Sequence, residues 1–129
     1  MNTCAQDIVT LLEGISSLAL SPGVDLFIGP MPDSPDECVS VTDSPGTEPD
    51  PNNYYNDSIQ VLVRGEVGGY ADASALAADI ATELHQYTGQ PDVYSAVYTL
   101  VWQTSSPFFI GTDENNRPLF STNYRIQRR

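Results

Sequence analysis

The sequence predicts an α+β fold, with a mainly antiparallel sheet and two helices packed on one face. Two segments space their apolar residues as one face of a helix does, whereas the segments around them alternate apolar and polar side chains as strands do. Successive strands that each carry one apolar face favour an antiparallel or mixed sheet covered on one side. At 129 residues, the chain has the length of a single domain that can bury a core.

The first half of the chain predicts one helix and two strands. A helix over residues 3–19 follows from the apolar spacing of Ile8, Leu11, Leu12 and Ile15, with Thr3 or Asn2 as its cap. Strands are predicted at 24–28 and 37–43, joined by a connection with three prolines. The next segment, 44–57, is acidic and proline-rich, and we expect a long loop there.

The second half predicts a strand, a helix and a further set of strands. Residues 58–65 alternate as a half-buried strand, and a helix over 71–87 follows, with an alanine-rich apolar stripe that fits closely against a sheet. A long strand at 93–104 and a short apolar stretch at 108–110 come next. Residues 113–118 read as a turn, and 119–127 as the last strand.

Charge is unevenly distributed along the chain. The formal net charge is −12, the chain has no lysine, and four of its five arginines lie in the last nineteen residues. This acidity argues against sequence-specific binding of duplex DNA, which depends on neutralising phosphates, although an acidic surface can lie beside DNA without holding it. No run approaches the ~18 apolar residues of a membrane span, and we expect no membrane partner.

The sequence contains no pattern that favours catalysis. His85 is a lone histidine at the polar edge of the second helix, with no nucleophile in a matching context. The carboxylate clusters are typical of solvated loops, and Gly65, Gly68 and Gly69 lack the lysine of a phosphate-binding loop. We therefore expect no enzyme and no cofactor. The chain carries no secretion signal, so we expect Cys4 and Cys38 to remain thiols in a reducing cytoplasm.

Two aromatic pairs border the expected loops, Tyr54–Tyr55 and Phe108–Phe109. Adjacent strand residues point to opposite faces, so we expect one ring of each pair to be exposed. The exposed ring either belongs to a loop folded over the core or lies in an interface with another protein, where aromatic residues are enriched.

Four pieces of the chain, taken in order, resemble the bacteriophage minor capsid proteins related to tail terminators. They are LFIGPMPDSPDECVSVTDSPG (26–46), SIQVLVRG followed by GGYADA (58–73), LHQY (84–87) and FFIGTDENNRPLFSTNYRI (108–126). The GTDENNRP-to-NYRI and PDSPDECVSV parts are the most specific. The resemblance covers most of the chain and implies a single tail-terminator-like domain.

The resemblance implies a structural role in a virion. Proteins of this kind look like rings of six subunits at the top of the phage tail. The ring stops growth of the tail tube and joins the tail to the head connector or a neck protein, and the genome passes through its centre. The implied partners are therefore further copies of the chain, the tail tube protein and the connector. The DNA comes only into transient, non-specific proximity, and assembly takes place in the host cytoplasm.

A head-to-tail ring needs two unlike surfaces on each subunit, and the charge distribution suggests them. We expect basic residues near the C-terminus of one copy to meet the acidic segment of the next, with exposed aromatic rings beside them. The candidate interface residues are Arg117, Arg125, Arg128, Arg129, Asp43, Glu48, Asp50, Tyr54, Tyr55 and Phe108. Two other functions remain open: a head-completion or neck adaptor protein, which also forms rings, and a small metal- or ligand-binding domain that uses the acidic loop.

Overall fold

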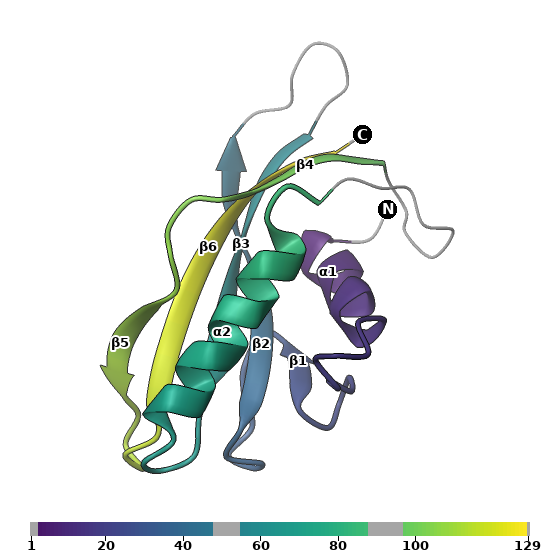
Figure 1. Ribbon diagram of the computed structural model, residues 1–129. Coiled ribbons are helices and arrows are strands. Elements are labelled where there is room, and N and C mark those ends of the chain that lie inside the picture. Colours follow the sequence, from purple (N-terminus) through teal and green to yellow (C-terminus); the bar gives the residue numbers. More distant parts are fainter. Residues whose placement is uncertain (1–2, 48–54, 88–96, 129) are drawn as a thin grey trace.

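The computed structural model describes residues 3–47, 55–87 and 97–128. Two helices and six strands alternate along the chain (Figure 1). In order, they are α1 (Cys4–Glu13), β1 (Leu26–Ile28), β2 (Cys38–Thr47), β3 (Tyr55–Arg64), α2 (Tyr70–Leu84), β4 (Tyr98–Gln103), β5 (Phe108–Thr112) and β6 (Pro118–Arg128).

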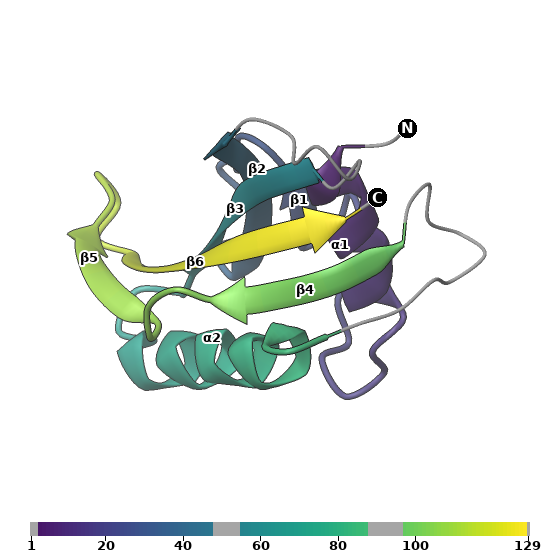
Figure 2. The same cartoon turned by 90° about the horizontal axis from the view of Figure 1, so that it is seen from above.

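The six strands form one mixed sheet in the order β1-β2-β3-β6-β4. The pair β1–β2 is parallel and the remaining pairs are antiparallel. The edge of β6 that faces away from β3 is shared, since β4 pairs with its C-terminal part and β5 with its N-terminal part. Figure 2 shows β4 and β5 following one another along β6. The predicted α+β class and the mainly antiparallel sheet are confirmed.

One core cluster combines the apolar faces of the helices with alternate positions of the strands. Ile8 and Leu12 come from α1, while Ile80 and Leu84 come from α2, and each is almost completely buried. The strands contribute Leu26, Val39, Val41, Ile59, Val61, Val63, Tyr98, Val101, Phe120, Tyr124 and Ile126. Buried Ala73 and Ala77 present small side chains on the inner face of α2, which lets the helix approach the sheet closely.

Helix α1 is shorter than the sequence predicts. Thr3 caps it, as expected: the Thr3 side chain accepts from Gln6 N–H, and the Gln6 side chain accepts from Thr3 N–H. The helix ends at Glu13, where Gly14 N–H bonds back to the last turn. The extension to residue 19 is wrong, because apolar spacing continues into the following turns, where Ile15 and Leu18 still pack against the core.

The expected long loop at 44–57 is largely a hairpin. Strand β2 continues to Thr47 and β3 begins at Tyr55, while residues 48–54 lie outside the described part. Proline is tolerated here because the pairing is irregular between Ser44 and Thr47, and because β1 covers only residues 39–41 of β2. The composition of this segment does not indicate the ends of β2 and β3, because polar side chains can occupy a hairpin whose faces are exposed to water.

The other elements match the predictions to within a few residues. Helix α2 ends at Leu84, before Gln86 adopts a positive φ of 64°. Of the strand predicted at 93–104, residues 98–103 form β4, whereas 93–96 lie outside the described residues. The apolar stretch 108–110 opens strand β5, and the last strand runs from Pro118 to Arg128.

Candidate assembly surfaces

Arg117, one of the predicted interface residues, is buried within the fold. Its side chain is 5% exposed, and its Nη2, Nη1 and Nε atoms pair with Asp33 at 3.0 Å, Asp36 at 3.1 Å and Asp113 at 2.8 Å. Burial opposes the charge on Arg117, but the hydrogen bonds to Asp113 and Asp36 prevail and hold its pKa above the usual value. Arg117 therefore ties the β5–β6 turn to the 33–36 segment.

A second buried arginine fixes the same proline-rich segment. Arg64 lies at the end of β3 and donates to the backbone carbonyls of Pro32 at 2.6 Å, Pro35 at 2.7 Å and Asp36 at 2.9 Å. Each of these carbonyls gains a charged donor, so the segment is ordered without a helix or strand of its own. The two arginines, 53 positions apart in sequence, thus brace one connection from two sides.

Arg128 also has its partners within the chain. Its Nε donates to Asp57 at 2.9 Å, and its Nη1 lies 3.8 Å from the buried carboxylate of Asp7 in α1. The hydroxyl of Tyr98 in β4 donates to the same Asp7 carboxylate at 2.5 Å. This cluster joins α1 to three strands. Burial is the largest influence on Tyr98, and with the Asp7 hydrogen bond it raises the Tyr98 pKa far above its ordinary value.

Arg125 differs from the other described arginines because it is exposed, and it makes no ion pair with a described residue, whereas Arg64, Arg117 and Arg128 are buried. It lies in β6 between Ser58 of β3 and Trp102 of β4. Arg125 lines an open hollow of about 430 Å³ whose other walls include Asn56, Leu100 and Gln127. Among the predicted basic contact residues that are described, Arg125 is the one that can reach an outside carboxylate.

The predicted acidic and aromatic contact residues are only partly described. Asp43 is exposed, and its carboxylate also accepts from Ala5 N–H at the start of α1, at 3.0 Å. Tyr55 is 41% exposed at the start of β3. Glu48, Asp50, Tyr54 and Arg129 lie outside the described residues.

Strand β5 carries an exposed apolar surface larger than the sequence predicts. Phe108, Phe109 and Ile110 are 44%, 43% and 46% exposed, so the expectation that only one ring of this pair is exposed is wrong. Phe109 still contacts the rings of Phe120 and Tyr70, but β5 is an edge strand, so nothing covers its outer side among the described residues. We call Tyr70, Phe108, Phe109 and Ile110 the β5 patch.

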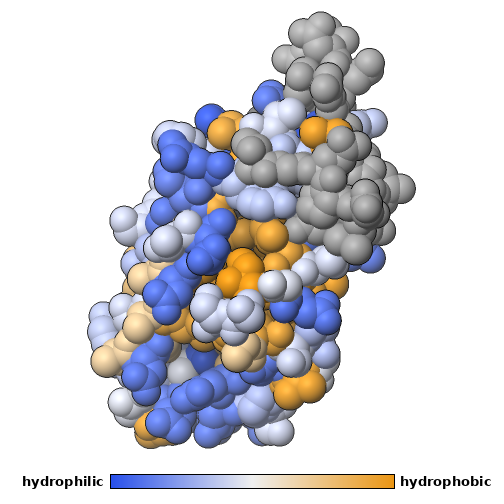
Figure 3. Space-filling model, turned by 45° about the vertical axis from the view of Figure 1, so that its right-hand side comes forward, coloured by the Kyte–Doolittle hydropathy of each residue, from blue (hydrophilic) through white to orange (hydrophobic). Residues whose placement is uncertain are grey.

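One end of the molecule is acidic. The ends of β3 and β5 and the starts of β2, α2 and β6 meet there, at the bottom of Figure 1, and Figure 3 shows a mostly hydrophilic surface at this end. We define this acidic end by the carboxylates Asp33, Asp36, Glu37, Glu66, Asp72, Asp113 and Glu114. Burial tends to raise the pKa of Asp113, but bonds from Arg117 and Asn115 outweigh it and hold that pKa below its usual value.

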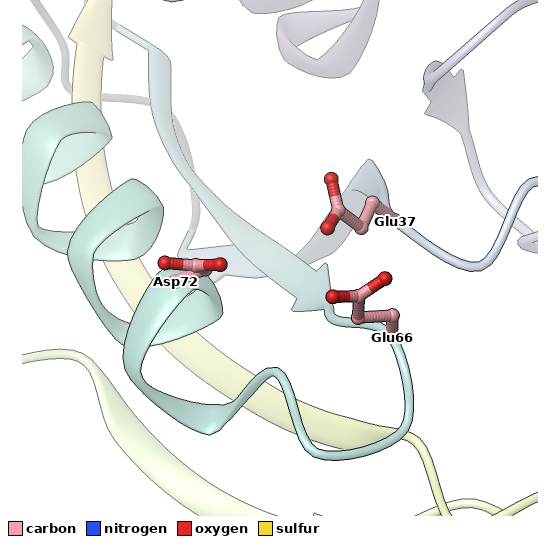
Figure 4. Close-up of side chains that lie close together, drawn as sticks. All are labelled: Glu37, Glu66 and Asp72. Atoms are coloured by element: carbon pink, nitrogen blue, oxygen red, sulfur yellow. The ribbon is translucent and has the colours of Figure 1, made fainter.

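Three carboxylates of the acidic end come within 4.8 Å of one another: Glu37, Glu66 and Asp72 (Figure 4). The sequence gives little signal for this group, because Glu37 lies just before β2, and only the fold brings it beside Glu66 in the β3–α2 turn and Asp72 in the first turn of α2. Carboxylate oxygens suit a hard divalent cation. However, all three side chains are exposed to water, and exposed acidic groups commonly lie together without an ion. We assign no metal site to them.

Comparisons with known proteins identify a family and solved structures of similar fold. The model of a family described as "Bacteriophage tail terminator protein" matches residues 11–129. A chain from a solved structure, "Virion of native gene transfer agent (GTA) particle", is similar with a TM-score of 0.68 and 13% identity, covering 98% of each chain. At this identity, the likeness shows the fold alone. No curated protein matches the sequence. No helix of the described residues is long and apolar enough to cross a membrane.

Proposed function

Because the chain belongs to the bacteriophage tail terminator family, we propose that it forms a ring that caps the tail tube and joins it to the head connector. The chain is a structural protein of a phage-type virion. Six copies would surround a central opening through which DNA passes. The match over residues 11–129, nearly the whole chain, is the observation that carries this proposal.

The charges of the described residues support a ring whose copies meet through unlike surfaces. Arg117 and Arg128 already have carboxylate partners inside the chain, so they brace the subunit rather than reach a neighbour. Arg125 is exposed beside an open hollow, and we assign it to a carboxylate of the next copy. Exposed Asp43 at the β2 edge is the described candidate acid, with Glu48 and Asp50 as further candidates. A contact of this kind sets register and partner choice more than affinity.

The acidic end supports a passage that does not retain DNA. Three of its seven carboxylates, Asp33, Asp36 and Asp113, pair with the single cation of the buried Arg117, while Glu37, Glu66 and Asp72 are all exposed. A surface of this charge repels the phosphate backbone within about a Debye length, roughly 8–10 Å at physiological salt. We propose that the acidic end borders the channel, so that the genome moves past without being held.

A tube-growth assay tests the proposed function. Tail tube protein from the same virion is polymerised with and without this chain, and tube length is followed by light scattering and electron microscopy. We expect growth to stop at substoichiometric amounts of the chain, because only tube ends need capping. Unchanged tube length, together with binding to the head connector, would favour the neck adaptor function instead.

A matched pair of variants tests the role of Arg125. Arg125→Ser removes the exposed cation, whereas Thr82→Ser changes an exposed side chain on the outer face of α2 without changing charge. We expect native mass spectrometry to show weaker assembly only for Arg125→Ser. If both variants assemble as the parent protein does, Arg125 has no place in the contact.

A further inference from the structure

The outer strands β1 and β5 lie on the same cross-strand row of the sheet. Leu26 of β1 pairs with Val39, Val39 pairs with Val63, Val63 with Phe120, and Phe120 with Phe109 of β5. The row therefore runs from one edge strand to the other at one height of the sheet. A second copy placed beside the first, at the same height, brings its β1 edge opposite β5 of the first.

The strand directions also suit such a contact. The antiparallel pairs β2–β3, β3–β6 and β6–β5 reverse direction three times, and β1 runs parallel to β2. Strand β5 therefore runs opposite to β1. Rotation about an axis along the strands preserves direction, so β5 of one copy meets β1 of the next in an antiparallel sense, which is slightly more stable per residue than parallel pairing.

Exposed apolar side chains lie at both edges. The β5 patch occupies one edge, with Tyr70 52% exposed beside the three residues of the strand. At the other edge, Val24 and Ile28 are 62% and 48% exposed. Two unlike apolar surfaces on opposite sides of one subunit are what a head-to-tail ring requires.

The backbone leaves room for only a short pairing. Val39 N–H bonds to Asp25 C=O, and Gly29 N–H bonds to Val41 C=O, so alternate residues of this segment face β2. The backbone N–H and C=O of Leu26 point away from β2, but they already bond to Ser21 C=O and Gly23 N–H. Ile28 is therefore the residue of β1 whose backbone groups can pair with the next copy. The irregular pairing around Ile110 likewise limits ladder formation at β5. Side-chain packing must therefore supply most of the contact.

The size of the β5 patch is appropriate for half of an interface. Its three aromatic rings, each of about 150–250 Å², leave roughly 200–350 Å² in water at the exposures given above. Ile110 brings the total to about 300–400 Å², within the range of surface patches that are often functional. A stable interface buries about 800 Å² on each partner, so the patch supplies close to half, and the surrounding polar surface supplies the rest.

We propose that the β5 patch of one copy packs against Ile28 and Val24 at the β1 edge of the next copy, so that the sheet continues around the ring. This contact rests on the proposed ring and specifies the surfaces that close it. It lies on the same flank as Arg125, since β4 and β5 share one edge of β6. The contact is thus apolar beside β5 and charged beside β4.

Two edge variants and their mixture test the proposal. Ile110→Asp damages the β5 edge, Ile28→Asp damages the β1 edge, and Ala75→Asp adds the same charge to the exposed face of α2 as a control. Assembly is measured by native mass spectrometry, alone and with tail tubes. We expect each edge variant to need at least a tenfold higher protein concentration than the parent protein to form rings. Ala75→Asp should form rings at the parental concentration. A 1:1 mixture of the edge variants should form dimers but no rings, because each retains one intact edge.

Several outcomes would overturn this contact. Rings formed by either edge variant at parental concentrations would reject it while leaving the ring itself in place. Loss of rings only in Ile110→Asp would place the β5 patch against a surface of the next copy other than the β1 edge, and loss of tube binding without loss of rings would assign the patch to the tail tube. A parent protein that stays monomeric both alone and on tubes would reject the contact and the proposed function together. If an aspartate variant fails to fold, the milder Phe108→Ser and Val24→Ser replace it.

Discussion

Replacing Arg128 with glutamine should destabilise the subunit, because it removes the cation beside a buried acid. The Asp7 side chain is 1% exposed and that of Arg128 is 8% exposed, so water cannot replace the lost partner. Asp7 would keep its hydrogen bond from Tyr98 but lose the neighbouring charge. The change also removes the 2.9 Å bond from Arg128 Nε to Asp57.

The size of the effect follows from burial and distance. Removing one member of a buried ion pair typically costs about 3–5 kcal/mol. The Arg128–Asp7 distance is 3.8 Å and the Asp57 side chain is 33% exposed, so neither contact is at its strongest. We therefore expect a loss near the lower limit, about 3 kcal/mol. For a chain of this size, that corresponds to a fall of roughly 10 °C in Tm.

Arg125→Gln is the matched control for this prediction. Arg125 lies on the same strand, three residues earlier, but its side chain is exposed, so its loss should change the free energy of unfolding by less than about 0.5 kcal/mol. Urea unfolding followed by circular dichroism measures both variants. The double variant Asp7→Asn/Arg128→Gln should lose less than the sum of the single changes. Equal stabilities for Arg128→Gln and Arg125→Gln would refute the role assigned to the buried cluster.

Three further predictions concern single sites. Burial, opposed in part by Arg128, raises the pKa of the Cys4 thiol to about 12, so the stability that Cys4 contributes is complete below its ordinary pKa of 9.0 and is lost as pH rises toward 12. We expect Cys4 to resist alkylation at pH 8.5 until the protein unfolds, and rapid alkylation of the native protein would contradict this. Gly46→Ala places a Cβ 2.2 Å from the backbone oxygen of Asn56 and should cost about 1–3 kcal/mol, whereas Gly14→Ala, with its nearest contact at 3.4 Å, should be tolerated in the same thermal melts. Arg117→Gln should increase amide hydrogen exchange in the 33–36 segment, and unchanged exchange there would show that Arg64 alone holds it.

Local patterns in the sequence predict most of the fold. The spacing of Ile8 and Leu12 and the cap at Thr3 are local properties, and they place α1 correctly at its start. The end of α1 is less predictable, because Ile15 and Leu18 reach the core from turns rather than from a helix. The β2–β3 hairpin is missed for a related reason, since strand pairing depends on a partner strand and not on the polarity of the segment itself.

The candidate surfaces are harder to predict, because they depend on contacts between distant residues. The sequence identifies a basic C-terminal end but not which arginines are free. Arg117 finds Asp33 across 84 positions, and Arg128 finds Asp57 across 71, so both are used inside the fold. The predicted exposure of an aromatic ring at Phe108–Phe109 underestimates the patch, since the edge position of β5 leaves both rings open.

Electron microscopy of the protein mixed with tail tubes tests directly whether the chain closes a ring that caps the tube. We expect a ring of one subunit's thickness on one end of each tube, formed by the parent protein and absent with Ile110→Asp or Ile28→Asp. Tubes with bare ends, or tubes decorated along their length by single copies of the protein, would contradict a terminating ring.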